Sequence, residues 1–149
     1  MTNEDWYMRY VDGFLFDDEG ANVLLIRKAR PQWQAGLLNG IGGKIEDGEC
    51  PVDAMCREFA EETGITFNLW KHTIRHEGPD WTVFYYRAYS TKTINAVLDQ
   101  GSYPTDERPE LCPVMRLEQC VRNIKWAIPL SNDRDGLVFP VLIRDDSPV

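Results

Sequence analysis

The chain has 149 residues, of which 43% are hydrophobic and 27% are charged. These proportions are typical of a globular domain and exclude a largely disordered chain, so we predict a single domain over residues 1–149. The net charge of −8 at pH 7 has the wrong sign for binding a duplex nucleic acid backbone, and no apolar run approaches the roughly 20 residues that cross a bilayer.

The first two predicted strands form a hairpin. The segments RYVDGFLFD (9–17) and NVLLIRKA (22–29) flank DEGA, a turn rich in Asp, Glu and Gly. A loop then leads to a short apolar strand around Leu37–Ile41. A second hairpin is predicted for LWKHTIRHE (69–77) and WTVFYYRAYS (81–90), which flank the turn GPD.

The clearest helix is predicted over Pro51–Thr63. Pro51 suits a first helical position, and Gly64 follows the last turn as a stop signal. The apolar face of this helix is formed at helical spacing by Val52, Met55, Cys56, Phe59 and Thr63.

The remaining segments have weaker patterns. Residues 91–113 contain strand-like and loop-like pieces whose boundaries the pattern leaves open, and residues 116–124 and 125–130 have weaker helical patterns. Pro140 argues against a long uninterrupted helix in the apolar segment 136–143. Strands mixed with about two helices predict an α+β or α/β sandwich.

The cysteines and the first residues indicate a compartment. The four cysteines include no CxxC pair at zinc spacing, and MTNEDWYMRY lacks a basic segment followed by an apolar run. We therefore expect free thiols and a cytoplasmic protein.

Acidic residues crowd the predicted helix and the loop before it. Seven acids and one base, Arg57, lie between positions 46 and 62. Glu58, Glu61 and Glu62 share one helix face, where Glu58 and Glu62 are like charges four residues apart. A solvated face is one interpretation, but such faces usually intersperse Lys or Arg. A divalent cation held by these oxygens is the alternative, and hard oxygen ligands select Mg²⁺ or Mn²⁺.

The residues before this helix favour an anionic ligand. Gly42 and Gly43 have no Cβ, so their backbone can approach a ligand or ion closely. Lys44 can offer a positive charge to phosphate oxygens. Glu49 and Arg57 can pair and fix the loop against the helix, which is a structural role.

These positions carry a resemblance to a known family. Gly43, Glu49 and the run REFAEETGI (57–65) resemble a complete Nudix box, GX5EX7REUXEEXGU, where U is a bulky apolar residue. Every fixed position matches. Cys50 stands where Ser or Thr often caps the helix, which predicts a weaker cap.

The resemblance implies a fold, an activity and a cofactor. Nudix hydrolases have an α/β/α sandwich around a mixed sheet and hydrolyse nucleoside diphosphates linked to another group, using Mg²⁺ or Mn²⁺. Carried over by position, Glu58, Glu61 and Glu62 would be metal ligands with the carbonyl of Gly42, while Glu49 and Arg57 would hold the loop and helix together. The general base stays open between Glu58, Glu61 and an acid outside the box.

Several members of the family add a fourth acidic ligand from a later loop. The segment PTDERPELCPV supplies Asp106, Glu107 and Glu110 in the corresponding region, and we favour Glu110, followed by Glu107. An acidic surface loop is the competing interpretation for each of them.

The substrate is predicted from a second likeness. GLLNGIGGKIEDGE is similar to the segment in MutT-like members that hydrolyse oxidised purine nucleoside triphosphates, where an Asn at the place of Asn39 reads the purine edge. A turn residue is the other role for Asn39. Trp33 and Trp126 can stack on a base or pack in the core, and Asp133 and Asp135 loosely resemble base-reading acids.

Two other functions stay open. Pro79 lies near the distance at which members acting on ADP-ribose or nucleotide sugars carry a proline, although GPD also suffices as a turn. A catalytically inactive Nudix nucleotide sensor usually loses carboxylates that this chain keeps. The expected partner is therefore a small nucleotide, with no duplex nucleic acid and no membrane, bound by a monomer or homodimer.

Overall fold

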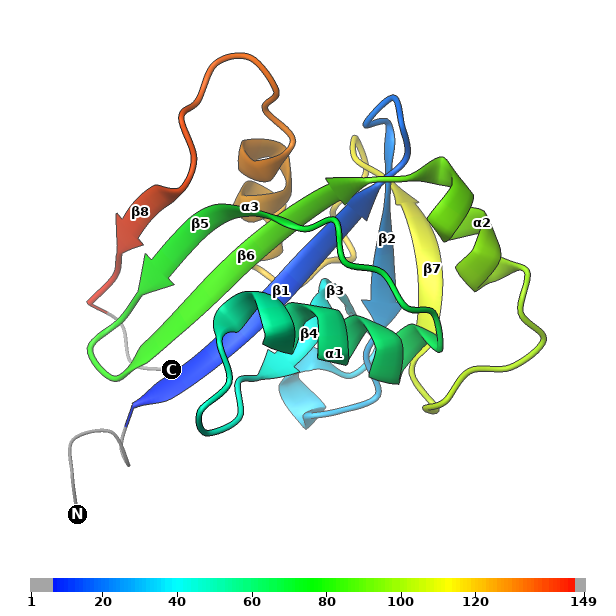
Figure 1. The fold of residues 1–149 in the computed structure, drawn as a ribbon, viewed down its shortest axis with the longest axis horizontal. Coiled ribbons are helices and arrows are strands. Elements are labelled where there is room, and N and C mark those ends of the chain that lie inside the picture. Colours follow the sequence, from blue (N-terminus) through cyan, green and yellow to red (C-terminus); the bar gives the residue numbers. More distant parts are fainter. Residues whose placement is uncertain (1–6, 147–149) are drawn as a thin grey trace.

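A mixed β-sheet forms the centre of the computed structural model, which describes residues 7–146 (Figure 1). The strands are β1 (Met8–Phe16), β2 (Asn22–Arg27), β3 (Leu38–Asn39), β4 (Ile41–Lys44), β5 (Lys71–Glu77), β6 (Trp81–Tyr89), β7 (Arg108–Pro113) and β8 (Val141–Arg144). The helices are α1 (Pro51–Thr63), α2 (Thr91–Leu98), α3 (Ile124–Ser131) and the 3₁₀ turn η2 (Gln32–Gln34).

The sheet combines parallel and antiparallel pairs. Its main order is β3-β2-β1-β6-β5-β8, while β4 pairs with β1 and β7 with β2. The pairs β1–β6 and β5–β8 are parallel, and the others are antiparallel. Both predicted hairpins are confirmed, because β1 pairs with β2 and β5 with β6.

Helices cover both faces of the sheet. In Figure 1, α1 lies in front of the sheet and α3 behind it. Met55 and Phe59 of α1 and Ile94 of α2 share one buried cluster with Leu24 of β2. Ile128 of α3 belongs to a second cluster on the opposite face. The predicted α/β/α sandwich with a mixed sheet is confirmed.

Helix α1 begins and ends where the sequence predicts. Cys50 occupies the N-cap without a side-chain hydrogen bond, as expected for a cap that lacks Ser or Thr, and Gly64 follows the last turn with a φ of 79°. All four cysteines are free. Within residues 7–146, no helix combines the length and apolarity that a membrane span requires.

Three segments differ from the sequence prediction. Thr91–Leu98 is a helix, capped by the Ser90 hydroxyl, which accepts from the Thr93 amide. The helical prediction over residues 116–124 is wrong, because only Ile124 is helical and α3 continues from there through Pro129. The strand predicted around residues 37–41 is two strands separated at Gly40.

At Gly42, β4 lies very close to the backbone of β1. Gly42 pairs with Asp12, and a Cβ built on it would lie 1.9 Å from the carbonyl oxygen of Val11. Backbone atoms of a central strand cannot move aside cheaply, so this register requires glycine.

We predict that Gly42→Ala lowers the free energy of unfolding by about 2–3 kcal/mol, because the added methyl group collides with backbone. Urea denaturation measures the change. Gly101→Ala is the control, since nothing lies within 4 Å of its Cβ position, and it should change stability by less than about 0.5 kcal/mol. Equal losses in both variants would contradict the explanation.

Candidate functional site

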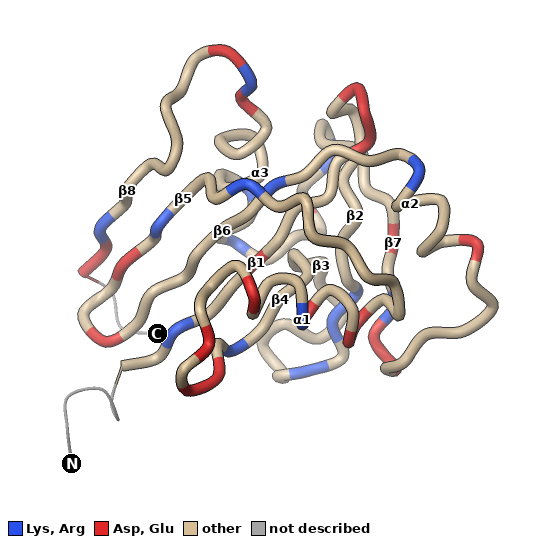
Figure 2. The backbone as a smooth tube through the Cα atoms, viewed as in Figure 1, with Lys and Arg blue, Asp and Glu red and all other residues tan. Residues whose placement is uncertain are grey.

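The candidate site lies where β4 and the following loop meet α1. Figure 2 shows acidic residues gathered along α1 and the loop that precedes it. An open cavity of about 460 Å³ lies here and is lined by Lys44, Ile45, Glu46, Asp47, Arg57, Glu58 and Glu61. The cavity combines cationic and anionic side chains, as a site for a phosphorylated ligand and a cation requires.

Arg57 holds the loop, the helix and β4 together. Its Nε and Nη2 donate to the two carboxylate oxygens of Glu49 at 2.8 and 2.9 Å, and Nη2 also donates to the carbonyl of Lys44 at 3.0 Å. The predicted pairing of Glu49 with Arg57 is confirmed. This guanidinium holds the pKa of Glu49 below its usual value.

Arg57 also offsets part of the charge on the acidic helix face. Its Nη1 donates to Glu58 Oε1 at 3.0 Å and to Glu61 Oε2 at 3.1 Å. Burial nevertheless raises the pKa of Glu58. The Glu58 carboxylate lies against Gly43, where an added Cβ would come within 2.5 Å of Oε1. Arg57 therefore compensates Glu58 and Glu61 more directly than their spacing alone indicates.

Glu62 is the member of the triad that no protein group satisfies. Its Oε2 is buried and has no hydrogen-bond partner. Burial, followed by the nearby charge of Glu58, raises the pKa of Glu62 to about 8, although Lys28 acts in the opposite direction. A buried carboxyl oxygen without a donor costs free energy, so this position favours either a bound proton or a cation.

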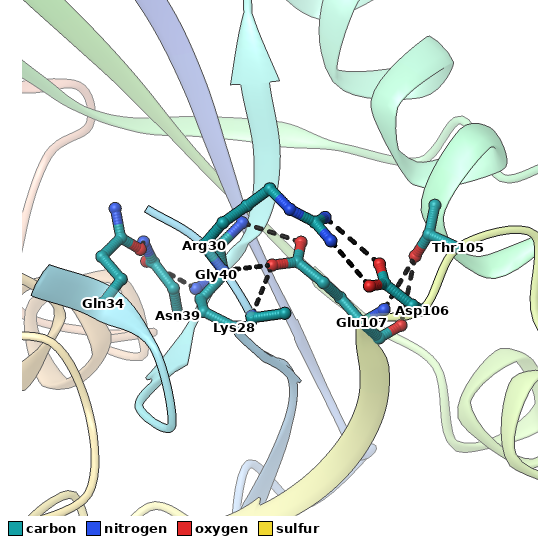
Figure 3. Close-up of polar contacts among 9 residues, drawn as sticks. Lys28, Arg30, Gln34, Asn39, Gly40, Thr105, Asp106 and Glu107 are labelled. Carbon is teal, nitrogen blue, oxygen red and sulfur yellow. Dashed lines mark hydrogen bonds and ion pairs between the residues drawn. The ribbon is translucent and has the colours of Figure 1, made fainter. Parts of the chain in front are cut away.

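Glu107 acts electrostatically on Glu62, and its own carboxylate is fully engaged by hydrogen-bond donors, as Figure 3 shows. It accepts from Lys28 Nζ at 3.0 Å, from the Ala29 amide at 2.7 Å and from the Arg30 amide at 3.3 Å. Burial acts to raise its pKa, but these donors hold the pKa below its usual value. The two Nη atoms of Arg30 also donate to the two carboxylate oxygens of Asp106, at 3.1 and 2.6 Å. The loop after β2 is therefore fixed to the segment just before β7.

Glu110, the acid favoured from the sequence as a fourth ligand, lies on the other side of the sheet. Both of its oxygens accept from Arg27, at 2.8 Å each. Its register partner Leu25 belongs to the α3-side core, whereas Glu62 is on α1. The structure therefore does not bring Glu110 together with the acids of α1, and Glu107 comes closer to them.

Each predicted base-reading residue is engaged by its own local neighbours. Asn39 Nδ2 donates to Gln34 Oε1 at 2.9 Å, and its Oδ1 accepts from the Gly40 amide at 2.7 Å (Figure 3). Trp126 packs edge-on against Tyr85. Asp133 Oδ1 accepts hydrogen bonds from the backbone amides of Asp135 and Gly136, in a turn after α3. Those amides lower the pKa of Asp133 and give it a local structural role.

A divalent cation fits the donor chemistry of this site. The ligands available are carboxylates and backbone carbonyls, and the unpaired Glu62 oxygen lacks a positive partner. Glu58 and Glu61 are held by Arg57, and among residues 7–146 no three His, Cys, Asp or Glu side chains are gathered tightly enough to hold a metal ion. Gathering all three glutamates around a cation therefore requires Arg57 to release at least one of them.

Sequence reasoning missed Lys28 and Asp12. Lys28 donates to Glu107 and acts electrostatically on both Glu62 and Asp12. Asp12 lies in β1, and its Oδ1 is buried with no hydrogen-bond partner. The available signal was an Asp within the otherwise apolar run YVDGFLF.

Comparison with known proteins points to one family. The sequence model of the NUDIX domain family matches residues 6–131. Over 66 residues the chain is 39% identical to the 8-oxo-dGTP diphosphatase of Escherichia coli (strain K12), covering 42% of this chain and 50% of that protein. The 8-oxo-dGTP diphosphatase of Proteus vulgaris is 35% identical over 65 residues, covering 42% and 58%. The alignments thus span about half the length of these curated relatives.

Solved structures share the fold without separating substrates. A NUDIX hydrolase from Nitrosomonas europaea aligns with a TM-score of 0.68 and 16% identity, covering 93% of this chain and 80% of that chain. MutT from Bacillus halodurans aligns with a TM-score of 0.62 and 21% identity, covering 87% of this chain and 85% of that chain. An ADP-ribose pyrophosphatase from Streptococcus suis aligns with a TM-score of 0.64 and 14% identity, covering 91% of this chain and 98% of that chain. These similar scores support a common fold alone.

The raised pKa of Glu62 predicts a pH-dependent stability. A folded-state pKa of about 8 lies above the usual 4.5, so the native state holds this proton more tightly than the unfolded chain. The stabilisation is fully present below about pH 4.5 and is lost as pH rises towards 8. Without divalent cations, wild-type protein should lose about 2–4 kcal/mol across this range relative to Glu62→Gln.

Urea denaturation in chelator at pH 5 and pH 8 measures this difference. Mg²⁺ added at pH 8 should restore stability to the wild type and have less effect on Glu62→Gln. Glu19 is exposed, so Glu19→Gln serves as the matched control. Its free energy of unfolding should change with pH as it does in the wild type. If the free energy of unfolding of Glu62→Gln changed with pH as much as that of the wild type, another group would be responsible for the pH dependence.

Proposed function

Because the chain belongs to the NUDIX domain family, we propose that it hydrolyses a nucleoside diphosphate linked to another group, with Mg²⁺ as cofactor and Mn²⁺ as a substitute. The leading substrates are (d)NTPs, including oxidised purine (d)NTPs, which would yield the nucleoside monophosphate and pyrophosphate. The observation that carries the proposal is the unpaired buried oxygen of Glu62, on the same helix whose Glu58 and Glu61 line the cavity together with Lys44.

Each side chain has a distinct proposed role. Glu58, Glu61 and Glu62, with the carbonyl of Gly42, would hold the metal, which supplies charge neutralisation at the phosphates and a more acidic water. Lys44 lines the cavity, from where its ammonium group would contact phosphate oxygens. Glu49 and Arg57 keep the loop and helix in register.

The general base is proposed among the acids at the cavity. Glu58 has a raised pKa because of burial, which brings it closer to the range of an effective base at neutral pH. Glu61 is more exposed, with 55% of its side chain accessible. We therefore favour Glu58 over Glu61 for accepting the proton of the attacking water.

The substrate assignment rests on partial likeness. The relatives that match at 35–39% identity are 8-oxo-dGTP diphosphatases, and Asn39 stands next to Gly40 at the end of β3. ADP-ribose is the second candidate, because a protein of that activity has an equally similar fold. An inactive sensor is disfavoured by the complete set of helix carboxylates.

The first test is hydrolysis of a substrate panel with Mg²⁺ present or chelated. The panel includes dNTPs, 8-oxo-dGTP, ADP-ribose, NADH and dinucleoside polyphosphates, and we expect Mg²⁺-dependent turnover led by the triphosphates. Glu58→Gln and Glu62→Gln should each lower kcat at least 100-fold while keeping the fold, and Glu19→Gln should keep wild-type activity. Near-normal activity in both site variants refutes the proposal, and preference for ADP-ribose overturns the substrate class alone.

A second prediction separates the two candidate fourth acids. Glu107→Gln should lower kcat/KM at least tenfold, because Glu107 and its partner Lys28 both act electrostatically on Glu62. Glu110→Gln should lower it less than threefold, because Glu110 faces Arg27 on the opposite side of the sheet. Thermal unfolding of both variants corrects for lost ion pairs. The reverse order of effects would return the fourth-acid role to Glu110.

A further inference from the structure

Two of the four cysteines lie together in the core on the α3 side of the sheet. Cys112 is in β7, and Cys120 forms an isolated bridge with Leu38 of β3. Both belong to the α3-side core and are only 5% and 3% exposed. Their thiols are hydrogen-bonded to one another. The tertiary structure therefore pairs two sulfur atoms that come from different parts of the sheet.

The segment that joins the two cysteines turns back on itself. The Arg116 amide donates to the carbonyl of Pro113 at 2.9 Å, and the Cys120 amide donates to the carbonyl of Leu117 at 3.0 Å. The Cys112 thiol donates to the carbonyl of Arg116 at 3.3 Å, so its sulfur lies directly against this segment. These turns return the chain to Cys112 and hold the two thiols in contact.

The far end of this segment is fixed to β3. The Leu38 amide donates to the carbonyl of Gln119 at 2.9 Å, and the Val121 amide donates to the carbonyl of Leu38 at 2.9 Å. Arg27 Nη1 adds a hydrogen bond to Gln119 Oε1 at 2.9 Å. The position of Cys120 is therefore set by backbone bonds on both sides of it, and its contact with Cys112 does not depend on a loose loop.

The other two cysteines are not placed for the same bond. Cys50 is the N-cap of α1, and Cys56 lies within that helix. At 1.5 Å per residue they are about 9 Å apart along the helix axis, beyond the roughly 7 Å between Cα atoms that a disulfide spans. Cys56 packs against the α1-side core, so the sheet separates it from Cys112 and Cys120.

We propose that Cys112 and Cys120 form a reversible intramolecular disulfide when the protein meets a peroxide. One thiolate attacks an oxygen of hydrogen peroxide, the O–O bond breaks, and the hydroxide that leaves takes up a proton to become water. The other sulfur attacks the resulting sulfenic acid, the S–S bond forms, and a second water leaves with the remaining thiol proton. Two thiols are oxidised and one peroxide is reduced to two waters.

The environment of the pair sets how this bond forms and what it does. Burial raises the pKa of both thiols, so few are ionised at neutral pH and the reaction is slow. Residues 114–119 have no helix or strand of their own, and local opening there would admit peroxide. A disulfide closing this loop restricts the unfolded chain, so we expect the midpoint of thermal unfolding to rise by about 5 °C.

The test treats folded wild-type protein with hydrogen peroxide, blocks the remaining thiols with iodoacetamide in denaturant, and maps tryptic peptides by mass spectrometry. Trypsin cuts after Arg116, between the two cysteines, so the disulfide joins two peptides and lowers their summed mass by two hydrogen atoms. Dithiothreitol should separate the two peptides. Cys112→Ser should lose the linked pair, whereas the matched control Cys56→Ser should keep it.

The outcomes decide the inference without any measurement of hydrolysis. Linked peptides carrying Cys112 and Cys120, with a higher unfolding midpoint in peroxide-treated wild type and no such rise in Cys112→Ser, support it. Absence of these peptides, or bonds that join either cysteine to Cys50 or Cys56 instead, overturns it. An unchanged or lower midpoint in the oxidised wild type overturns the stabilising role. If Cys112→Ser does not fold, Cys112→Ala replaces it, and the wild-type peptide map is decisive by itself.

Discussion

The guanidinium of Arg57 is the interaction on which the site depends. It contacts Glu49, Glu58, Glu61 and the carbonyl of Lys44, so one side chain joins the loop, the helix and β4. Bidentate pairing fixes its orientation as well as its charge. Because burial leaves the Glu58 side chain only 13% exposed, the guanidinium there is less screened than in a surface pair. This arrangement keeps like charges together in the protein while leaving Glu62 without a partner.

The fold was most predictable where local signals agree with tertiary packing. Pro51 and Gly64 mark α1 at both ends, and its apolar face matches the observed core around Met55 and Phe59. Helix α2 lacks such marks, since Thr91, Thr93 and Ile94 are β-branched and have weak helix propensity. Its apolar residues Ile94 and Val97 are stabilised by packing on the α1-side core, which no local pattern reveals. Helix α3 is likewise short and contains Pro129, so contacts with the sheet decide its position rather than propensity.

The sequence predicted which acids belong to the candidate site. It did not predict on which face of the sheet each of them lies. The spacing of Glu58, Glu61 and Glu62 defines one helix face, yet it does not tell which of them Arg57 satisfies. Glu110 lies in β7, whereas Glu107 lies just before this strand begins at Arg108, so strand alternation alone does not place Glu107. The tertiary structure shows that Glu107 meets Lys28 and that Glu110 meets Arg27, near the end of the β2–β7 pairing. Tertiary register, which the sequence does not encode locally, therefore separates the two acids.

Acidic side chains lie on both faces of the sheet. The carboxylates of α1 and the Lys28–Glu107 pair lie on one side, whereas Asp12 shares the other with Phe14 and Tyr85. Gly40 lies between β3 and β4. A side chain at this position would displace the Asp12 carboxylate, and a side chain at Gly43 would displace Glu58. The short segment from Asn39 to Lys44 therefore contacts acidic side chains on both faces of the sheet, Asp12 on one and Glu58 on the other.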